Sequence, residues 1–115
     1  KLVCNFDTGN FLYSEEDALM AYEKCKPYIR YVHCKDRTFE AHEGESPVIT
    51  TAGRKMYAVS VGGGCIPMRE ILSDLLQNGY DGVFAIEHFG SLRQLEDMEA
   101  SAKWLLKLGK EYGRQ

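Results

Sequence analysis

Apolar residues fall into three short runs along the chain, and between these runs they recur at the spacing of a helix. The runs are residues 2–6, 29–32 and 83–86. They contain mainly side chains that favour strands. Apolar positions three and four apart predict helices over about residues 15–26, 67–79 and 92–108. The pattern therefore predicts three strands that alternate with three helices.

Local signals mark the ends of these helices. Ser14 is expected to be the N-cap of the first helix, and Pro27 closes that helix. Ser91 followed by Gln94 has the spacing of a capping box, so the third helix should begin there. Gly109 is expected to end it.

A long segment separates the second strand from the second helix. Residues 38–61 exceed the roughly 2–6 residues that are usual for such a connection. Within it, Val48–Thr51 and Met56–Val59 flank a turn that contains glycine, which predicts a hairpin. Because the segment follows the carboxyl end of a strand, we expect it to cover a site there.

The order β-α-β-(insertion)-α-β-α indicates an α/β fold with a parallel sheet, in a single domain over residues 1–115. Right-handed crossovers would place all three helices on one face of the sheet. The strands look apolar on both sides, so the second face is expected to need more protein. Three βα units do not close a barrel, and the absent initiator Met also suggests a fragment of a (β/α)8 barrel.

Composition argues against several classes of partner. A net charge of −3 gives no reason to expect nucleic acid or a membrane as a partner, and no apolar run in the sequence is long enough to span a bilayer. The cysteines at 4, 25, 34 and 65 lack the Cys-x-x-Cys spacing. They are expected to be reduced thiols in a cytoplasmic protein, with Cys34 in a packing role.

Each predicted strand delivers a metal-competent side chain at its carboxyl end: Asp7, His33 and Glu87. Parallel strands joined by helices place these ends side by side, so the three groups should converge. Two carboxylates and an imidazole suit one divalent ion, Mn²⁺, Mg²⁺, Co²⁺ or Zn²⁺. Singly, each residue has an ordinary structural explanation. Together, at three equivalent strand ends, they favour a metal site.

Other polar residues nearby are candidates for contact with a substrate. Lys35, Asp36 and Arg37 could orient an anionic or hydroxylated molecule, or form a solvated cluster of ion pairs at the loop entrance. Asn10 and His88 could offer hydrogen bonds, although a turn role for Asn10 and a surface position for His88 fit equally well. The glycines at 62–64 could present N–H groups to a phosphate, but a conformational role is favoured because the phosphate-loop residues are missing.

Five motifs follow one another along nearly the whole chain: residues 6–10, 31–36, 61–67, 79–82 and 86–87. In this order they resemble the carboxyl-terminal part of the sugar phosphate isomerase/epimerase superfamily, the xylose isomerase-like TIM barrels. The resemblance implies that the three strands are the last three of eight. It also implies a single divalent ion bound by two acidic residues, an aspartate and a histidine. Asp7, His33 and Glu87 match three of these ligands, and the acidic ligand of the preceding strand has no counterpart.

The resemblance further implies a sugar, or sugar phosphate, isomerase or epimerase that moves a proton next to a carbonyl through an enediolate. Glu87 would be both ligand and acid/base, with Asn10, Lys35, Asp36 and Arg37 facing the sugar. Asn10 stands where the family often has His, and Gly63 where it often has Glu, which leaves the substrate open.

Two other functions stay open. One is a metal phosphodiesterase related to the apurinic endonucleases of the same barrel family, which use several zinc ions. The other is a non-catalytic fragment that associates with itself through its open sheet. Whichever function holds, the chain alone is expected to be inactive and to form homo-oligomers, because its open strand edge and bare sheet face are unprotected.

Overall fold

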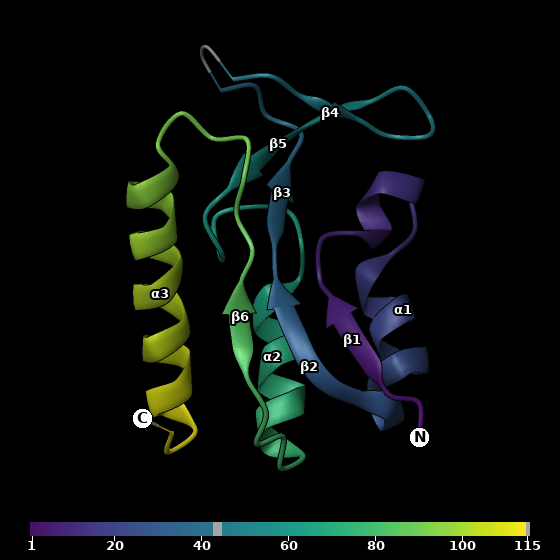
Figure 1. Cartoon of the computed structure of the whole chain (residues 1–115), viewed down its shortest axis with the longest axis vertical. Coiled ribbons are helices and arrows are strands. Elements are labelled where there is room, and N and C mark those ends of the chain that lie inside the picture. Colours follow the sequence, from purple (N-terminus) through teal and green to yellow (C-terminus); the bar gives the residue numbers. More distant parts are fainter. Residues whose placement is uncertain (43–44, 115) are drawn as a thin grey trace.

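Three parallel strands form the centre of the fold. A computed structural model describes residues 1–42 and 45–114 (Figure 1). The strands pair in the order β1-β2-β6. Their bounds are Cys4–Asp7 for β1, Ile29–Cys34 for β2 and Phe84–Ile86 for β6. The α-helices between and after them are α1 (Ala18–Cys25), α2 (Met68–Gln77) and α3 (Gln94–Glu111). Two short 3-10 helices, η1 (Phe11–Ser14) and η2 (Lys26–Tyr28), flank α1. The predicted alternation of strands and helices is confirmed.

One face of the sheet is buried against the helices. Phe6, Val32 and Cys34 on this face are at most 1% exposed, and they share a core with Ile71 and Leu72 of α2. Burying each such side chain contributes on the order of 1.5–3 kcal/mol, which makes this layer the main source of stability. Burial also raises the pKa of the Cys34 thiol to about 12, in keeping with its predicted packing role.

The opposite face of the sheet carries both polar and apolar side chains, so the prediction of strands that are apolar on both sides is wrong in this respect. Successive side chains of a strand point to opposite sides, so Asn5, Asp7, Tyr31 and His33 point away from the helices. Asn5 is exposed, and Tyr31 is 40% exposed. The strands are so short that their alternation between apolar and polar positions is hard to recognise in the sequence. Tyr31, an aromatic residue on the open face, hides it further.

The insertion forms a second, antiparallel sheet beyond the carboxyl end of β2 (Figure 1). Its strands are β3 (Asp36–Thr38), β4 (Val48–Ile49) and β5 (Lys55–Val59), in the order β3-β5-β4. The predicted hairpin corresponds to β4 and β5. Strand β3 was not expected, because its three residues are polar and carry no apolar alternation. It forms through backbone pairing with β5.

The first helix begins later than predicted. Ser14 belongs to η1, and the N-cap is Asp17, whose Oδ1 accepts a hydrogen bond from the Met20 N–H at 2.9 Å. Glu15 has a positive φ of 60°, so the chain turns there before the helix starts. The structure therefore uses Asp17, which follows this turn, as the N-cap in place of Ser14.

The third helix differs from the prediction at both ends. Ser91 does not cap it: its Oγ accepts from the Arg93 N–H at 3.0 Å, and the Gln94 amide donates to the His88 carbonyl oxygen. The helix then runs through Gly109 to Glu111. The glycine near the end of this helix that has a positive φ is Gly113, at 74°. Gly109 therefore lies within the helix and is not its stop signal.

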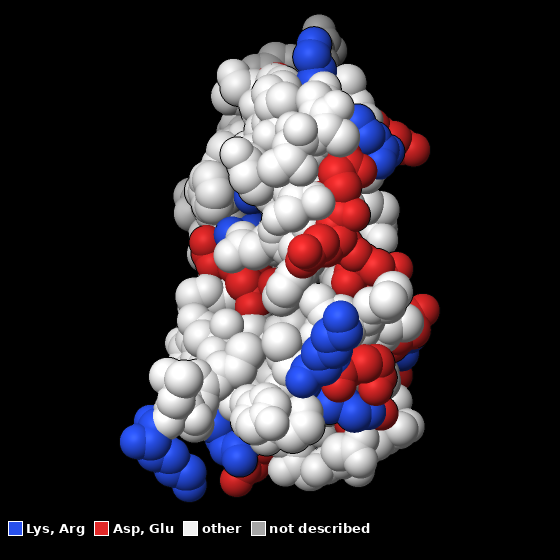
Figure 2. All heavy atoms as spheres, turned by 90° about the vertical axis from the view of Figure 1, so that its right-hand side faces the viewer, with Lys and Arg blue, Asp and Glu red and all other residues white. Residues whose placement is uncertain are grey.

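The described surface carries charges of both signs. Figure 2 shows the side that bears α1, where acidic side chains form a band across the middle and basic side chains gather mainly toward the lower end. Among the described residues, no helix has both the length and the apolar character needed to cross a membrane.

Tyr22→Phe tests how α1 is joined to α2. The Tyr22 ring is 1% exposed, and its hydroxyl donates to Asp74 Oδ2 at 2.6 Å. Losing this bond should lower the free energy of unfolding by about 1 kcal/mol in urea titrations. Tyr13→Phe is the matched control, because Tyr13 is 49% exposed and its hydroxyl has no hydrogen bond to the described residues. An equal loss in both variants would contradict this account.

The same variant changes the dependence of stability on pH. The hydrogen bond from Tyr22 is the largest cause of the lowered pKa of the Asp74 carboxyl. A carboxylate whose pKa is lowered by folding stabilises the protein above its unfolded pKa, and this stability is lost as pH falls through the folded pKa. The unmodified protein should therefore lose stability more steeply than Tyr22→Phe below about pH 4. Parallel pH profiles would count against the interaction.

Candidate metal centre

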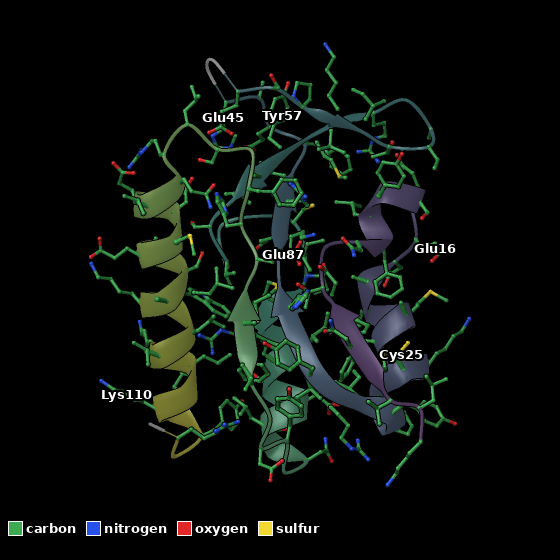
Figure 3. The ribbon with its side chains drawn as sticks, viewed as in Figure 1. Glu16, Cys25, Glu45, Tyr57, Glu87 and Lys110 are labelled. Atoms are coloured by element: carbon green, nitrogen blue, oxygen red, sulfur yellow. The ribbon has the colours of Figure 1, made fainter. Side chains whose placement is uncertain are left out.

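Parallel pairing brings the predicted strand-end residues together. Asp7 of β1 lies opposite His33 of β2, and Glu87 directly follows β6. Each of the three offers one ligand atom, and these atoms all lie within 4.8 Å of one another. In Figure 3, Glu87 lies near the middle of the molecule, below the small sheet that carries Tyr57. The structure thus places the three predicted ligands in one cluster.

The cluster is partly open to solvent. The Asp7 side chain is 10% exposed, whereas those of His33 and Glu87 are 33% and 35% exposed. His33 Nδ1 lies 2.8 Å from Glu87 Oε2 and 3.8 Å from Asp7 Oδ2. Asp7 is oriented by the Gly9 N–H, which donates to its Oδ1 at 2.9 Å. One carboxylate is therefore fixed and buried, and the other two groups face an accessible space.

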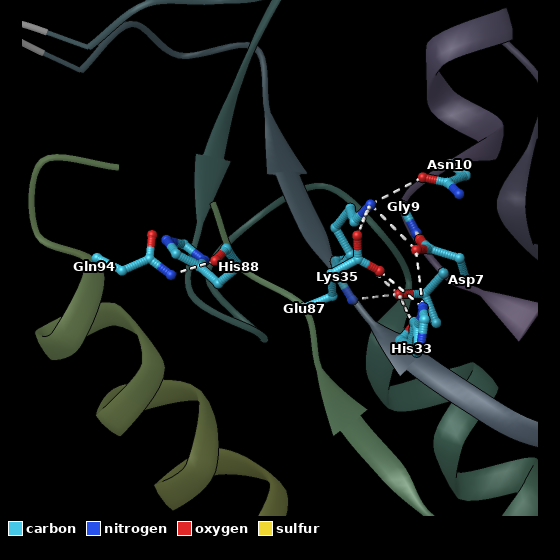
Figure 4. Close-up of polar contacts among 9 residues, drawn as sticks. Asp7, Gly9, Asn10, His33, Lys35, Glu87, His88 and Gln94 are labelled. Carbon is cyan, nitrogen blue, oxygen red and sulfur yellow. Dashed lines mark hydrogen bonds and ion pairs between the residues drawn. The ribbon is translucent and has the colours of Figure 1, made fainter. Parts of the chain in front are cut away.

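Lys35 joins this cluster, which sequence reasoning did not anticipate. Its Nζ lies 3.2 Å from Asp7 Oδ2, 2.9 Å from Glu87 Oε1 and 3.0 Å from Asn10 Oδ1 (Figure 4). The Lys35 side chain is only 7% exposed. The signal was present in the sequence, because residues two apart in extended chain share a side and Lys35 follows His33 at that spacing.

The two carboxyl groups have pKa values shifted in opposite directions. Burial raises the pKa of Asp7, and its hydrogen bond with Glu87 raises it further, while Lys35 opposes both effects. The hydrogen bond from Lys35 is the largest cause of the lowered pKa of Glu87. Glu87 is therefore ionised at neutral pH and can act as a ligand or as a proton acceptor.

The donor set fits a divalent ion. Two carboxylate oxygens and an imidazole nitrogen at this separation are ligands that Mn²⁺, Mg²⁺, Co²⁺ and Zn²⁺ all accept. Three protein ligands also leave coordination positions for further groups, which a catalytic ion requires.

Asp36 has partners different from those expected of a substrate-binding residue. Its carboxylate is buried, with the residue 2% exposed. It accepts four backbone N–H groups, from Arg37 and Ile66 on Oδ1 at 2.8 and 3.2 Å, and from Gly62 and Gly64 on Oδ2 at 2.9 and 3.2 Å. Asp36 thus holds the loop after β5, and its carboxylate oxygens are directed at backbone N–H groups.

The glycines of that loop serve its conformation. Gly62 has a positive φ of 89°, and a Cβ on Gly64 would lie 2.3 Å from the Arg37 carbonyl oxygen. The N–H groups of Gly62 and Gly64 are directed at Asp36. These contacts support the conformational role over the phosphate-binding alternative.

The two remaining candidates, Arg37 and His88, lie in different surroundings. Arg37 is 5% exposed, lies 5.2 Å from the centre of the Phe89 ring, and has no hydrogen-bond partner for its Nε among the described residues. His88 turns away from the cluster toward α3 (Figure 4). Its side chain is 3% exposed, with Nε2 at 3.3 Å from Asp97 Oδ2 but outside hydrogen-bonding geometry. The alternative of a surface position for His88 is therefore wrong.

One hollow of the described surface lies away from this cluster. It measures about 450 Å³, lies near the amino ends of β2 and β6, and is lined by residues that include Arg30, Asp74 and Gly82. None of the clustered residues reaches it. The hollow is therefore separate from the clustered polar groups.

Comparisons with known proteins identify the family and the fold that this chain resembles. Residues 1–108 match the family described as xylose isomerase-like TIM barrel. Inosose dehydratases from Lacticaseibacillus casei and Bacillus licheniformis are 29% identical over 86 residues and 32% identical over 85 residues; each alignment covers 71% of this chain and 28% of the relative. The crystal structure of a xylose isomerase domain protein from Planctomyces limnophilus superposes with a TM-score of 0.72 at 28% identity, covering 97% of this chain and 37% of that one.

Asp36→Asn tests the structural role of this carboxylate. The amide nitrogen of Asn would face two of the four N–H donors, which would lose their acceptor inside the protein. Each buried group left without a partner costs about 1–3 kcal/mol, so urea unfolding should show a loss in that range or larger. The exposed Asp81→Asn is the control and should change stability little. Equal stability of the two variants would show that Asp36 does not hold the loop.

Proposed function

The chain belongs to the xylose isomerase-like TIM barrel family, and from this premise we propose that it is part of a metal-dependent enzyme that modifies sugars. The chain spans 28% of the curated relatives and 37% of the related structure, so the activity is proposed for the whole protein. The observation that supports the proposal is the cluster of Asp7, His33 and Glu87 at three adjacent strand ends. Active sites of TIM barrels lie at this end of the strands.

Asp7, His33 and Glu87 would hold one divalent ion. When bound, such an ion stabilises negative charge that develops on a substrate oxygen. We propose that the three βα units are the last three of eight, and that the preceding strand of the full barrel contributes the fourth, acidic ligand. The protein would act in the cytoplasm on a small sugar or sugar phosphate, with neither nucleic acid nor membrane as a partner.

Glu87 is the proposed acid/base residue. The hydrogen bond from Lys35 lowers the pKa of its carboxyl group, and at 35% exposure the side chain can reach a bound molecule. It would remove a proton from the carbon next to a carbonyl group. Return of the proton to the neighbouring carbon gives an isomerase, and return to the opposite face of the same carbon gives an epimerase. The second reaction needs another proton-carrying group, which would come from the rest of the barrel.

Substrate contacts would come from the cationic and amide groups beside the ion. Lys35 and Asn10 lie against the cluster, and Arg37 packs near Phe89 with its Nε lacking a described partner. These groups can donate to the hydroxyl or phosphate oxygens of a sugar.

A dehydratase is the second candidate, and the inosose dehydratases among the relatives favour it. Dehydration also begins with removal of a proton next to a carbonyl, so Glu87 would keep the same role. The reactions differ in their products: a dehydratase releases water from the neighbouring carbon, whereas an isomerase leaves the mass of the sugar unchanged. Mass spectrometry of the product of the whole protein separates the two. A multi-zinc phosphodiesterase would instead bind more than one metal ion per chain.

Metal binding by the chain tests the proposed centre. Titration calorimetry with Mn²⁺ should show one site, and Asp7→Ala, His33→Ala and Glu87→Ala should each weaken it at least about tenfold, because each removes a ligand. The matched controls are Asp81→Ala, His42→Ala and Glu70→Ala, which alter exposed residues of the same types. Binding that is absent, or equally affected by ligand and control variants, would refute the site.

Self-association is expected of the chain alone. The edges of the three-stranded sheet, β1 and β6, are unpaired on their outer sides in the described structure, and Tyr31 is partly exposed on the open face. Light scattering after size-exclusion chromatography should therefore give a mass above that of one chain, rising with concentration. The same chain should be inactive on sugars. A monodisperse monomer would contradict the first expectation, and turnover by the chain alone would contradict the second.

A further inference from the structure

The Lys35 ammonium has a complete set of partners inside the cluster. It has three N–H bonds, and three oxygens lie within 3.2 Å of Nζ, on Asp7, Glu87 and Asn10. Two of these oxygens belong to proposed ligands of the ion. The ammonium therefore already neutralises part of the charge that a divalent ion would be drawn to.

The surrounding chain is shaped to hold this lysine. A Cβ on Gly9 would lie 2.8 Å from Lys35 Cγ and 2.8 Å from its carbonyl oxygen, so the lysine stem occupies space that any other residue at position 9 would fill. Thr8, which is fully buried, accepts from the Lys35 N–H at 2.9 Å and donates to the Lys35 carbonyl at 2.7 Å. Both contacts fix the point from which the side chain reaches the carboxylates.

From these contacts we propose that Lys35 is a tethered cation that competes with the divalent ion for the oxygens of Asp7 and Glu87. The inference rests on the proposed metal centre and adds a residue that sets its affinity. Coulomb repulsion between an ammonium and a divalent ion at this separation is substantial in a partly buried site. Binding of the ion therefore requires the ammonium to leave at least one carboxylate.

The structure offers the ammonium a place to go. Asn10 Oδ1, at 3.0 Å, is a neutral acceptor that the ion does not need. The Phe89 ring lies 5.2 Å from Nζ, and it is 52% exposed, so it can cover a cation that moves toward solvent. Lys35 would thus move from the carboxylate ligands toward Asn10 and Phe89.

If Lys35 had a purely structural role, its substitution would change metal affinity in the opposite direction. If Lys35 only holds the two carboxylates in position, its removal would disorder them and weaken metal binding. If Lys35 competes with the ion, its removal leaves two uncompensated carboxylates, which should bind the ion more tightly. The direction of the change in affinity therefore distinguishes the two roles.

The test compares Lys35→Met and Lys35→Gln with the unmodified chain. Lys103→Met is the control, because the Lys103 side chain is 74% exposed and, within the described part of the chain, pairs with Glu99 alone. Calorimetry with Mn²⁺ at about pH 8, where ordinary carboxyl groups are ionised, should give affinities at least about tenfold tighter for both Lys35 variants. In EDTA both variants should melt at lower temperature than the unmodified chain. Mn²⁺ should raise their melting temperature more than that of the unmodified chain.

Equal or weaker Mn²⁺ binding by the folded Lys35 variants would overturn the competition, while the proposed metal centre would stand if Asp7→Ala still abolished binding. No binding by any form, including the unmodified chain, would overturn both. Should neither variant fold, the unmodified chain decides: Mn²⁺ should increase acetylation of Lys35 by acetic anhydride relative to Lys103, measured by mass spectrometry. An unchanged ratio with Mn²⁺ bound would refute the displacement.

Discussion

Parallel pairing of β1, β2 and β6 is the constraint on which the site depends. The register sets Asp7 opposite His33 and brings Glu87 to the end of the third strand. Strand alternation then sends these side chains to the face opposite the apolar core, so the packing that stabilises the sheet also positions its chemistry. A slip of one residue in β2 would move His33 and Lys35 to the helix face and replace them with Val32 and Cys34.

A second constraint joins the parallel sheet to the insertion. Strand β3 follows β2 after a single residue, and its first residue, Asp36, gathers four backbone N–H groups around one buried carboxylate. Burial raises the pKa of Asp36, and these hydrogen bonds oppose the rise. The Asp36 carboxylate, which was expected to face a substrate, instead fixes the loop before α2. The neighbouring Lys35 points to the metal centre, where its ammonium group pairs with the carboxylates of Asp7 and Glu87.

The hydrophobic pattern was sufficient to predict the strands, the helices, the hairpin and the convergence of Asp7, His33 and Glu87. Each of these follows from the spacing of apolar residues along the chain and from the geometry of parallel strands. Details that depend on tertiary contacts could not be predicted: β3 forms only because β5 lies beside it, and Asp17 is the N-cap because η1 takes up Ser14. The contact of Lys35 with both carboxylates was within reach, since it shares the side of His33. Lys35 was predicted to contact a substrate, because residue spacing alone does not indicate an ion pair inside a metal site.

The central claim is that the strand ends form one metal centre in which Lys35 and the ion compete for the same oxygens. A crystal structure of the chain grown with Mn²⁺, with anomalous diffraction data, tests this most directly. The account predicts one anomalous peak in contact with Asp7, His33 and Glu87, with Lys35 Nζ displaced from the 2.9 Å contact that it makes with Glu87 Oε1. A peak bound elsewhere, or a peak at the cluster with Lys35 still in contact with both carboxylates, would contradict it.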